Sequence, residues 1–331
     1  MTMRQTLNAL LAALTITGIH AKSSDAGAQS YPSRPITMVV PFAAGGGTDT
    51  LARIVAEGMK ASLKQPVIVE NLPGAAGSVA LSKVSHAAPD GYTVVFGNWA
   101  THVVGPATRA ASYDVVKDFV AVSLAATQPL VIIANKRLPA NDLQGLIAWL
   151  KAHPDQATVG TAGPGSATHV AGLFFQAKTG ARVQLVPYRG GGAQSMQDLI
   201  GGHVNLAFTQ ASNALAHLRT GEIKAYAVTA KARLTAALEI PTVDDAGAPG
   251  LHVAVWHAIW APKGTPEAIV RKLNGAVVDT LAEPATRKRL ADISQEHFPH
   301  DQLTPEALAS FHAAEVATWW PIIKTSSSKA D

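Results

Sequence analysis

The sequence ITMVVPFAAGGGTD, which runs from Ile36 to Asp49, brings a short apolar segment to a glycine-rich stop directly before a second patterned segment. Residues 36–40 are rich in β-branched side chains and lie between two prolines, as expected for a buried parallel strand. The apolar residues that follow Asp49 have helical spacing, which predicts a helix with one face on a sheet. A strand, a glycine-rich turn and a helix in this order place free backbone N–H groups at the carboxyl edge of a sheet, where α/β proteins bind anions.

The rest of the chain repeats this order, which predicts an α/β fold. Strands are expected at residues 36–40, 67–70, 92–97, 130–134, 157–161, 182–187, 204–209, 223–229 and 253–260. Helix ends are marked by a capping box of Asn141 with Gln144, by Gly180 after a helix, and by Pro266 and Pro305 at first helical positions.

Composition narrows the classes of function. The 331 residues suggest two domains, and the formal net charge of +4 comes from scattered Lys and Arg side chains in a chain with 15% charged residues. Scattered charge does not favour a nucleic-acid partner. The chain has no cysteine, which excludes disulfides, thiol catalysis and thiolate metal sites. His297 and His300 lack a third ligand at a useful spacing, so we expect no metal and no cofactor.

The N-terminus has the three parts of a secretory signal peptide. Arg4 provides the positive start, Leu7 to Ile19 form an apolar segment too short to span a bilayer, and Ala26-Gly27-Ala28 form a small-residue cleavage site. Residues 1–28 are therefore expected to be removed on export to the periplasm. The alternative is an N-terminal helix that is frayed or anchored.

Six segments in order carry a family resemblance. They read VVPFAAGGGTD, VENLPGAAG, PDGYT, GTAGPGSATH, VPYRGGGA and PTVDDAG. This series resembles the periplasmic solute receptors of tripartite tricarboxylate transporters, the Bug receptors, from about Tyr31 to the last predicted helix. The resemblance implies a two-lobed, type II-like periplasmic binding protein with two hinge crossings, near residues 123–130 and 241–253.

The same resemblance implies domains and partners. Lobe 1 is expected to comprise residues 29–126 and 246–331, and lobe 2 residues 127–245. The implied partners are a small organic acid and membrane transporter subunits, with the receptor itself a monomer.

The first candidate site is the turn after residues 36–40. Its backbone N–H groups and the Thr48 hydroxyl are suited to a ligand carboxylate, which needs several donors when it leaves water. The candidate residues are Phe42, Ala44, Gly45, Gly46, Thr48 and Asp49. The alternative is a tight turn with an ordinary helix cap from Thr48 or Asp49. A dinucleotide site is disfavoured because the third glycine of G-x-G-x-x-G is missing.

The second candidate site is the glycine-rich segment from Gly160 to Thr168, which again joins a strand to a helix. By resemblance, a ligand carboxylate is held here through N–H groups and hydroxyls. The candidate residues are Thr161, Gly163, Gly165, Ser166 and Thr168. Without the resemblance, the hydroxyls are good helix caps.

Further candidates surround these two turns. Arg189 either pairs with an anion or points into solvent. Asn98, Trp99 and Thr101 follow a strand and are expected to line the cleft, where Trp99 either stacks on a planar ligand or packs beneath the turn. Trp256 either completes the pocket or belongs to the core.

The sequence thus predicts capture of a small organic acid without chemistry, followed by delivery to a membrane transporter. The sequence does not determine which class of acid carries the carboxylate: an aliphatic di- or tricarboxylate, an amino acid or an aromatic acid. Two alternatives remain: a ligand-sensing receptor for a membrane signalling partner, and an exported hydrolase with Ser166 as nucleophile and His169 as base. The hydrolase is disfavoured because no orienting carboxylate is near and the G-x-S-x-G motif is absent.

Overall fold

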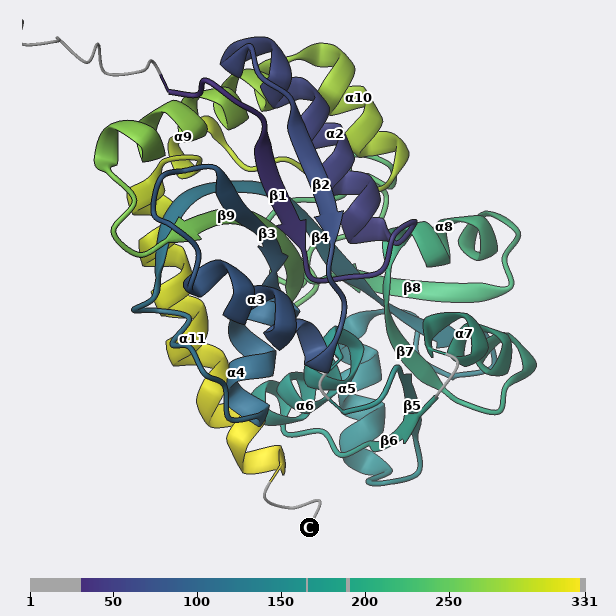
Figure 1. Cartoon of the computed structure of the whole chain (residues 1–331). Helices are drawn as coiled ribbons and strands as arrows, with labels where there is room; N and C mark the ends of the chain where they lie inside the picture. The colour runs from purple at the N-terminus through teal and green to yellow at the C-terminus, as the bar shows by residue number, and fades with distance from the viewer. Residues whose placement is uncertain (1–30, 165, 189–190, 328–331) are drawn as a thin grey trace, which may run out of the picture. The chain divides into compact units, whose positions relative to one another are not determined.

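The computed structural model describes residues 31–164, 166–188 and 191–327, so the predicted signal peptide, Gly165 and Arg189 lie outside the described residues. The first sheet has the strand order β2-β1-β3-β9-β4 (Figure 1). Its strands are β1 (Ile36–Val40), β2 (Val67–Asn71), β3 (Thr93–Asn98), β4 (Phe119–Asn135) and β9 (Ala254–Pro262). β1 is parallel to β2 and β3, whereas β9 is antiparallel to β3 and β4.

The second sheet shares β4 with the first. From β4 it continues in the order β4-β7-β5-β6, and β8 pairs with β4 as well. Its other strands are β5 (Thr158–Thr161), β6 (Gln184–Pro187), β7 (Leu206–Gln210) and β8 (Ile223–Val228). β5 is parallel to β6 and β7, and β4 is antiparallel to β7 and β8. All the strands predicted from the sequence are present, and the α/β fold class is confirmed.

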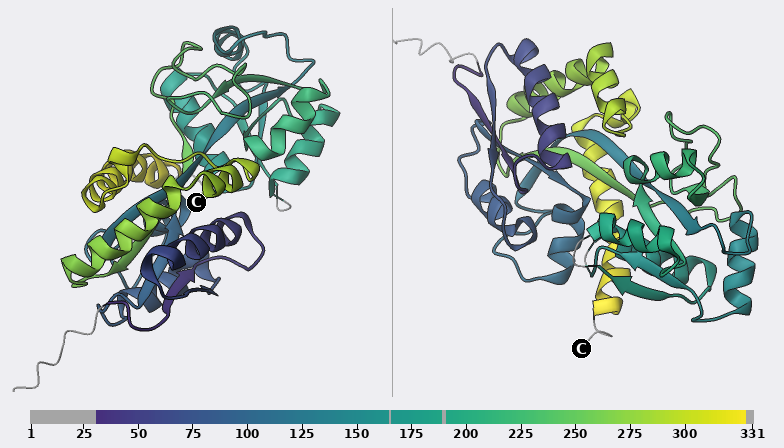
Figure 2. Two further views of the ribbon diagram at one scale, coloured as in Figure 1. Left: turned by 90° about the horizontal axis from the view of Figure 1, so that it is seen from above. Right: turned by 90° about the vertical axis from the view of Figure 1, so that its right-hand side faces the viewer.

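Helices cover both sheets. Those that contact the first sheet are α2 (Gly47–Leu63), α3 (Ser78–Ser85), α9 (Glu267–Ala282) and α11 (Pro305–Ser327), with α10 (Pro284–Asp292) packed on α2 and α9. The helices that contact the second sheet are α6 (Ala167–Thr179), α7 (Gly191–Gly201) and α8 (Ala211–Arg219), and α5 (Leu143–Ala152) precedes β5 in the chain. Short turns of helix are η1 (Ala75–Gly77), η2 (Ala100–Val104), α4 (Gly105–Thr108) and η3 (His300–Gln302). The long α11 runs beside β4 and reaches η2, α4 and α6 (Figure 2).

Strand β4 is the element that passes from one sheet to the other. Its pairing with β9 ends at Pro129, and its pairing with β7 and β8 begins at Leu130 and Val131. The buried Thr229 hydroxyl accepts from the Leu130 amide at 2.9 Å and lies 2.6 Å from the Val253 carbonyl oxygen, to which it donates. One side chain therefore ties the outgoing strand to the segment that returns to β9.

The prediction of a strand at 130–134 was too short, since β4 begins at Phe119. The half of β4 that the prediction missed has register shifts against β9 and contains Pro129. Both features disturb the alternation of apolar and polar residues that indicates a strand in a sequence. Two helix ends also differ from the prediction. Asp142, not Asn141, caps α5 by accepting from the Gly145 amide at 2.6 Å, and Pro266 is the N-cap of α9.

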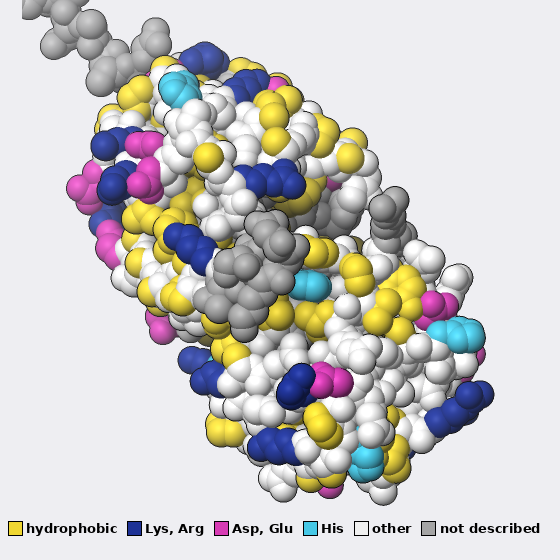
Figure 3. Space-filling model, turned by 90° about the horizontal axis from the view of Figure 1, so that it is seen from below, with side chains coloured by type: hydrophobic (Ala, Val, Ile, Leu, Met, Phe, Trp, Pro, Cys, Tyr) yellow, Lys and Arg dark blue, Asp and Glu magenta, His cyan; other side chains and the backbone are white. Residues whose placement is uncertain are grey.

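Other sequence predictions agree with the structure. Pro305 begins α11, and Gly180 ends α6 in the left-handed conformation with φ of 70°. On the face in Figure 3, Lys and Arg side chains are dispersed among neutral ones. Within the described part of the chain, no helix combines the length and apolarity needed to cross a bilayer.

Candidate ligand-binding site

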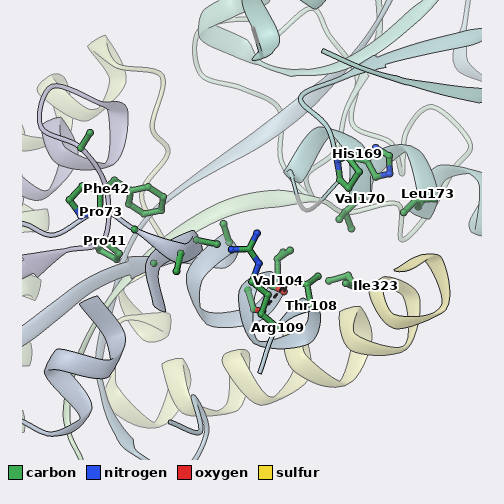
Figure 4. Close-up of a pocket in the computed structure, with 18 residues that line it drawn as sticks. Pro41, Phe42, Pro73, Val104, Thr108, Arg109, His169, Val170, Leu173 and Ile323 are labelled. Carbon is green, nitrogen blue, oxygen red and sulfur yellow. Dashed lines mark hydrogen bonds between the residues drawn. The ribbon is translucent and has the colours of Figure 1, made fainter. Parts of the chain in front are cut away.

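A cavity of about 590 Å³ lies where the loops after β1, β2 and β3 face the first half of α6. Figure 4 shows Pro41, Phe42 and Pro73 on one side, His169, Val170 and Leu173 on the other, and Val104, Thr108, Arg109 and Ile323 between them. The remaining wall residues are Ala43, Gly74, Ala75, Ala76, Gly77, Ala100, Gly105 and Pro164. The volume is in the range of small-molecule sites.

The turn between β1 and α2 is closed by the buried carboxylate of Asp49. Its Oδ2 accepts from the Gly45 amide at 2.8 Å and from Arg53 Nε at 3.0 Å, and its Oδ1 accepts from Asn71 Nδ2 at 2.9 Å. The hydrogen bond from Arg53, helped by those from Gly45 and Asn71, lowers the pKa of Asp49 to about 2 against the opposing effect of burial. The protein's own carboxylate thus occupies the Gly45 donor that the sequence assigned to a ligand.

Of the remaining predicted residues of this turn, one lines the cavity and three are exposed to solvent. Phe42 lines the cavity, whereas Ala44, Gly45 and Gly46 are exposed and lie outside its wall. No side chain caps α2, whose N-cap is Gly46. The alternative of a cap from Thr48 or Asp49 is therefore wrong, because Thr48 Oγ1 instead pairs with His257 Nε2 at 3.1 Å and Asp49 binds Gly45.

In the turn between β5 and α6, the described hydroxyls serve the turn itself. Ser166 Oγ donates to the Gly163 carbonyl at 2.6 Å and accepts from the His169 amide at 3.2 Å as the N-cap of α6. Thr161 Oγ1 accepts from the Gly163 amide at 3.2 Å, and Thr168 Oγ1 accepts from the Ala162 amide at 2.9 Å. These four predicted residues are absent from the cavity wall, to which their neighbours Pro164 and His169 belong.

Ser166 and His169 do not form a nucleophile and base. The His169 ring pairs through Nδ1 with Thr161 Oγ1 at 3.2 Å, while Ser166 meets the His169 backbone. Burial lowers the pKa of His169. Across the residues that the structure describes, no group of three His, Asp or Glu side chains is placed to hold a metal ion.

The predicted residues at the end of β3 and just after it are buried and do not belong to the cavity wall. Asn98 and Thr101 are hydrogen-bonded to each other. The Asn98 backbone N–H donates to Thr101 Oγ1 at 3.0 Å, and the Thr101 backbone N–H donates to Asn98 Oδ1 at 3.2 Å. Trp99 is fully buried and meets the Trp319 ring edge-on at 5.5 Å. Trp256 is also buried, and its indole donates to Glu315 at 2.7 Å. The structure therefore places both tryptophans in the core.

Sequence reasoning missed Arg109, the cation of the cavity wall. It follows α4, and its side chain extends into the space between Phe42 and His169 (Figure 4). Its guanidinium forms no ion pair or hydrogen bond with any described residue. The sequence held one signal: Arg109 is the single Lys, Arg, Asp or Glu between Asp90 and Asp114.

The turn from Gly74 to Gly77 was also missed as part of the site. Its four residues have positive φ angles of 139°, 45°, 56° and 93° in order, and the Gly77 amide donates to the Gly74 carbonyl at 2.8 Å. Ala75 and Ala76 in this conformation are strained, and such strain is concentrated at functional sites. The segment VENLPGAAG was part of the resemblance, yet its spacing gave no indication of a left-handed turn.

Comparison with known proteins decides the family. Residues 51–327 match the receptor of the tripartite tricarboxylate transporter family. The chain belongs to this receptor family. It is 40% identical over 292 residues to the UPF0065 protein in the TAR-I ttuE-ttuC' intergenic region of Agrobacterium vitis, covering 87% of this chain and 83% of that protein. It is 34% identical over 304 residues to the protein BugT of Bordetella pertussis, covering 91% and 92%.

Solved structures of similar receptors share the fold. MatC (Rpa3494) from Rhodopseudomonas palustris with bound malate has a TM-score of 0.70 and 36% identity, covering 88% of this chain and 100% of that one. The periplasmic binding protein BugD has a TM-score of 0.69 and 35% identity, covering 89% and 98%. Rpa4515 of R. palustris with adipate has a TM-score of 0.71 and 32% identity, covering 89% and 98%. The receptor therefore has the periplasmic binding protein fold.

In this receptor, we expect stability to fall as the pH falls below about 6.5. Burial lowers the pKa of His257 to about 3 and also lowers the pKa values of His102 and His312. The unfolded chain therefore binds more protons than the folded one between pH 6.5 and 3, so the stabilisation is present above pH 6.5 and is lost toward pH 3. The half-buried Glu315, whose pKa is raised by loss of solvent around its carboxyl group, acts in the opposite direction.

Urea unfolding at pH 7, 6 and 5 measures this dependence. His257→Gln is expected to remove up to about 1.4 kcal/mol per pH unit from the slope, the effect of one proton. The exposed His86→Gln serves as the control. An unchanged slope in His257→Gln would show that His257 does not titrate differently on folding.

Proposed function

We propose that this protein is a monomeric periplasmic receptor that binds a small organic acid without altering it and delivers it to the membrane subunits of a tripartite tricarboxylate-type transporter. The observation that carries this proposal is the exposed Arg109 guanidinium, which has no ion pair or hydrogen bond among the described residues and lies in the wall of a cavity sized for a small molecule. Family membership supports a receptor role, and the malate and adipate bound by two similar receptors support a carboxylate ligand.

Arg109 supplies the charge that such a ligand needs. A carboxylate that leaves water requires a cation or several donors, and the planar guanidinium offers two parallel N–H groups to it. The wall contains no Asp or Glu among its described residues, so nothing there competes for the guanidinium. A ligand anion is the natural counterion at this position.

Closure of two lobes is the second part of the proposal. Lobe 1 comprises residues 29–126 and 246–331, and lobe 2 comprises residues 127–245. The cavity wall contains Pro164, His169, Val170 and Leu173 from lobe 2, and its other residues, Ile323 included, belong to lobe 1. A ligand that contacts both stabilises the closed state through contacts that the open state lacks. The transporter then recognises the closed receptor.

Arg109→Gln is expected to weaken carboxylate binding by about 10- to 100-fold, the value of one lost charge-assisted hydrogen bond. Isothermal titration calorimetry with succinate, malate, adipate, citrate and benzoate identifies a ligand for the wild-type protein and then measures the loss in the variant. Arg219→Gln, on the exposed end of α8, is the matched control for net charge and should leave affinity unchanged.

Two outcomes would contradict the proposal. Equal affinity in the wild-type protein and in Arg109→Gln would show that Arg109 does not bind the ligand. If the wild-type protein bound none of the five acids, the proposal of a carboxylate ligand would be wrong. The periplasmic location is tested separately by the intact mass of the protein from the periplasmic fraction, which should correspond to a chain that starts near Gln29.

A further inference from the structure

The walls of the cavity are apolar apart from three side chains. Phe42, Val104, Val170, Leu173 and Ile323 provide its large aliphatic and aromatic surface, and prolines, alanines and glycines make up the rest. Among the described wall residues there is no Ser, Asn, Gln, Tyr, Asp or Glu side chain. The side chains therefore offer few partners for the hydroxyl groups of a ligand.

Thr108 and His169, two of the three polar side chains, are each partly engaged. Thr108 Oγ1 donates toward the Val104 carbonyl oxygen at 3.1 Å and toward that of Gly105 at 3.0 Å, so its hydroxyl is left to a ligand only as an acceptor. His169 uses Nδ1 for Thr161, and only its Nε2 is without a hydrogen-bond partner among the described residues. Arg109 is thus the strong donor of the cavity, and His169 Nε2 is the second polar side-chain atom of the wall without a partner among the described residues.

We infer that the ligand of this receptor is a carboxylate with an unsubstituted ring or alkyl chain, and that the cavity selects against hydroxylated acids. The inference rests on the proposed function and deepens it. The carboxylate lies at Arg109, and the apolar body lies against Leu173, Val170 and Ile323. A hydroxyl group placed against these side chains leaves water without gaining a hydrogen bond, which disfavours binding. An apolar body gains from the same burial.

Matched pairs of acids test the inference by calorimetry. Each pair shares its carbon skeleton and charge and differs in hydroxyl groups: succinate with tartrate, adipate with galactarate, and benzoate with 3,4,5-trihydroxybenzoate. In the pair that fits best, the unsubstituted acid is expected to bind at least about tenfold more tightly, since an unmade hydrogen bond reduces affinity by about that factor. Equal or tighter binding of the hydroxylated acids would overturn the inference while leaving the proposed function intact.

A change in the wall tests the cause of the selectivity. Leu173 is half-buried on α6, so Leu173→Ser introduces a hydroxyl partner with little risk to the fold. We expect this variant to reduce the preference for the unsubstituted acid several-fold, whereas Leu173→Ala removes the same bulk without a partner and keeps the preference. An unchanged preference in Leu173→Ser would show that the wall does not select, and failure of all six acids to bind would reject the proposed function as well.

Discussion

Gly77→Ala is expected to lower the free energy of unfolding by about 2–5 kcal/mol. Gly77 has φ of 93°, and a β-carbon added there would lie 2.5 Å from Thr101 Cγ2 and 3.2 Å from Pro41 Cβ. The unfavourable backbone costs about 1–3 kcal/mol and the overlap a similar amount. Thr101 has little freedom to yield, because its hydroxyl pairs with Asn98 and with His102 at 3.0 Å.

Gly221→Ala separates the two causes. Gly221 has φ of 69°, but a β-carbon there would meet no atom within 4 Å. This variant should show the backbone effect alone, about 1 kcal/mol. Urea unfolding of both variants gives the comparison. Equal losses would mean that Thr101 moves away from the added methyl group of Gly77→Ala at no measurable cost.

Glu315→Ala is expected to lower the free energy of unfolding by about 2–4 kcal/mol. Glu315 Oε2 accepts from the indole N–H of Trp256 at 2.7 Å and from that of Trp319 at 3.1 Å. Both rings are buried, so removal of the carboxylate leaves two donors without an acceptor, at about 1–3 kcal/mol each when no water replaces it. Burial raises the pKa of Glu315, which offsets part of the gain from the charge.

Glu315→Gln keeps an acceptor at the same position and should lose less than half as much. The exposed Glu239→Ala controls for the removal of a carboxylate as such. Tryptophan fluorescence during urea unfolding measures all three variants. If Glu315→Ala and Glu315→Gln are equally stable, the two indole bonds contribute nothing that the packing of the rings does not already provide.

Trp319, which bonds the Glu315 carboxylate, also packs against residues near both sides of the cavity. Its ring meets Trp99 at 5.5 Å and Phe174 of α6 at 4.9 Å, both edge-on. Ile323, one turn further along α11, lines the cavity. Glu315 therefore helps to hold the segment of α11 that lines the cavity.

The sequence by itself determined the elements and their order. The β-branched run at 36–40, the prolines and the glycine turns depend on local conformational preferences, which act over a few residues. The strand positions were right for that reason, except in the first half of β4, where pairing with β9 sustains a strand that local pattern does not show. The family was also readable, because six segments occur in one order along the chain.

Tertiary structure alone decided which polar groups are left for a ligand. The Gly45 amide is suited to an anion, but Asp49 occupies it, held by Asn71 from a strand 22 residues away in the chain. Thr48 is turned toward His257, 209 residues away, and the indole of Trp256 is satisfied by Glu315. Several partners are chemically possible for each of these donors and acceptors. Which one it bonds depends on which distant segment packs beside it. Arg109 is exposed and has no ion pair or hydrogen bond among the described residues, and only the packing of α4 against α11 and the neighbouring loops brings it into the cavity wall.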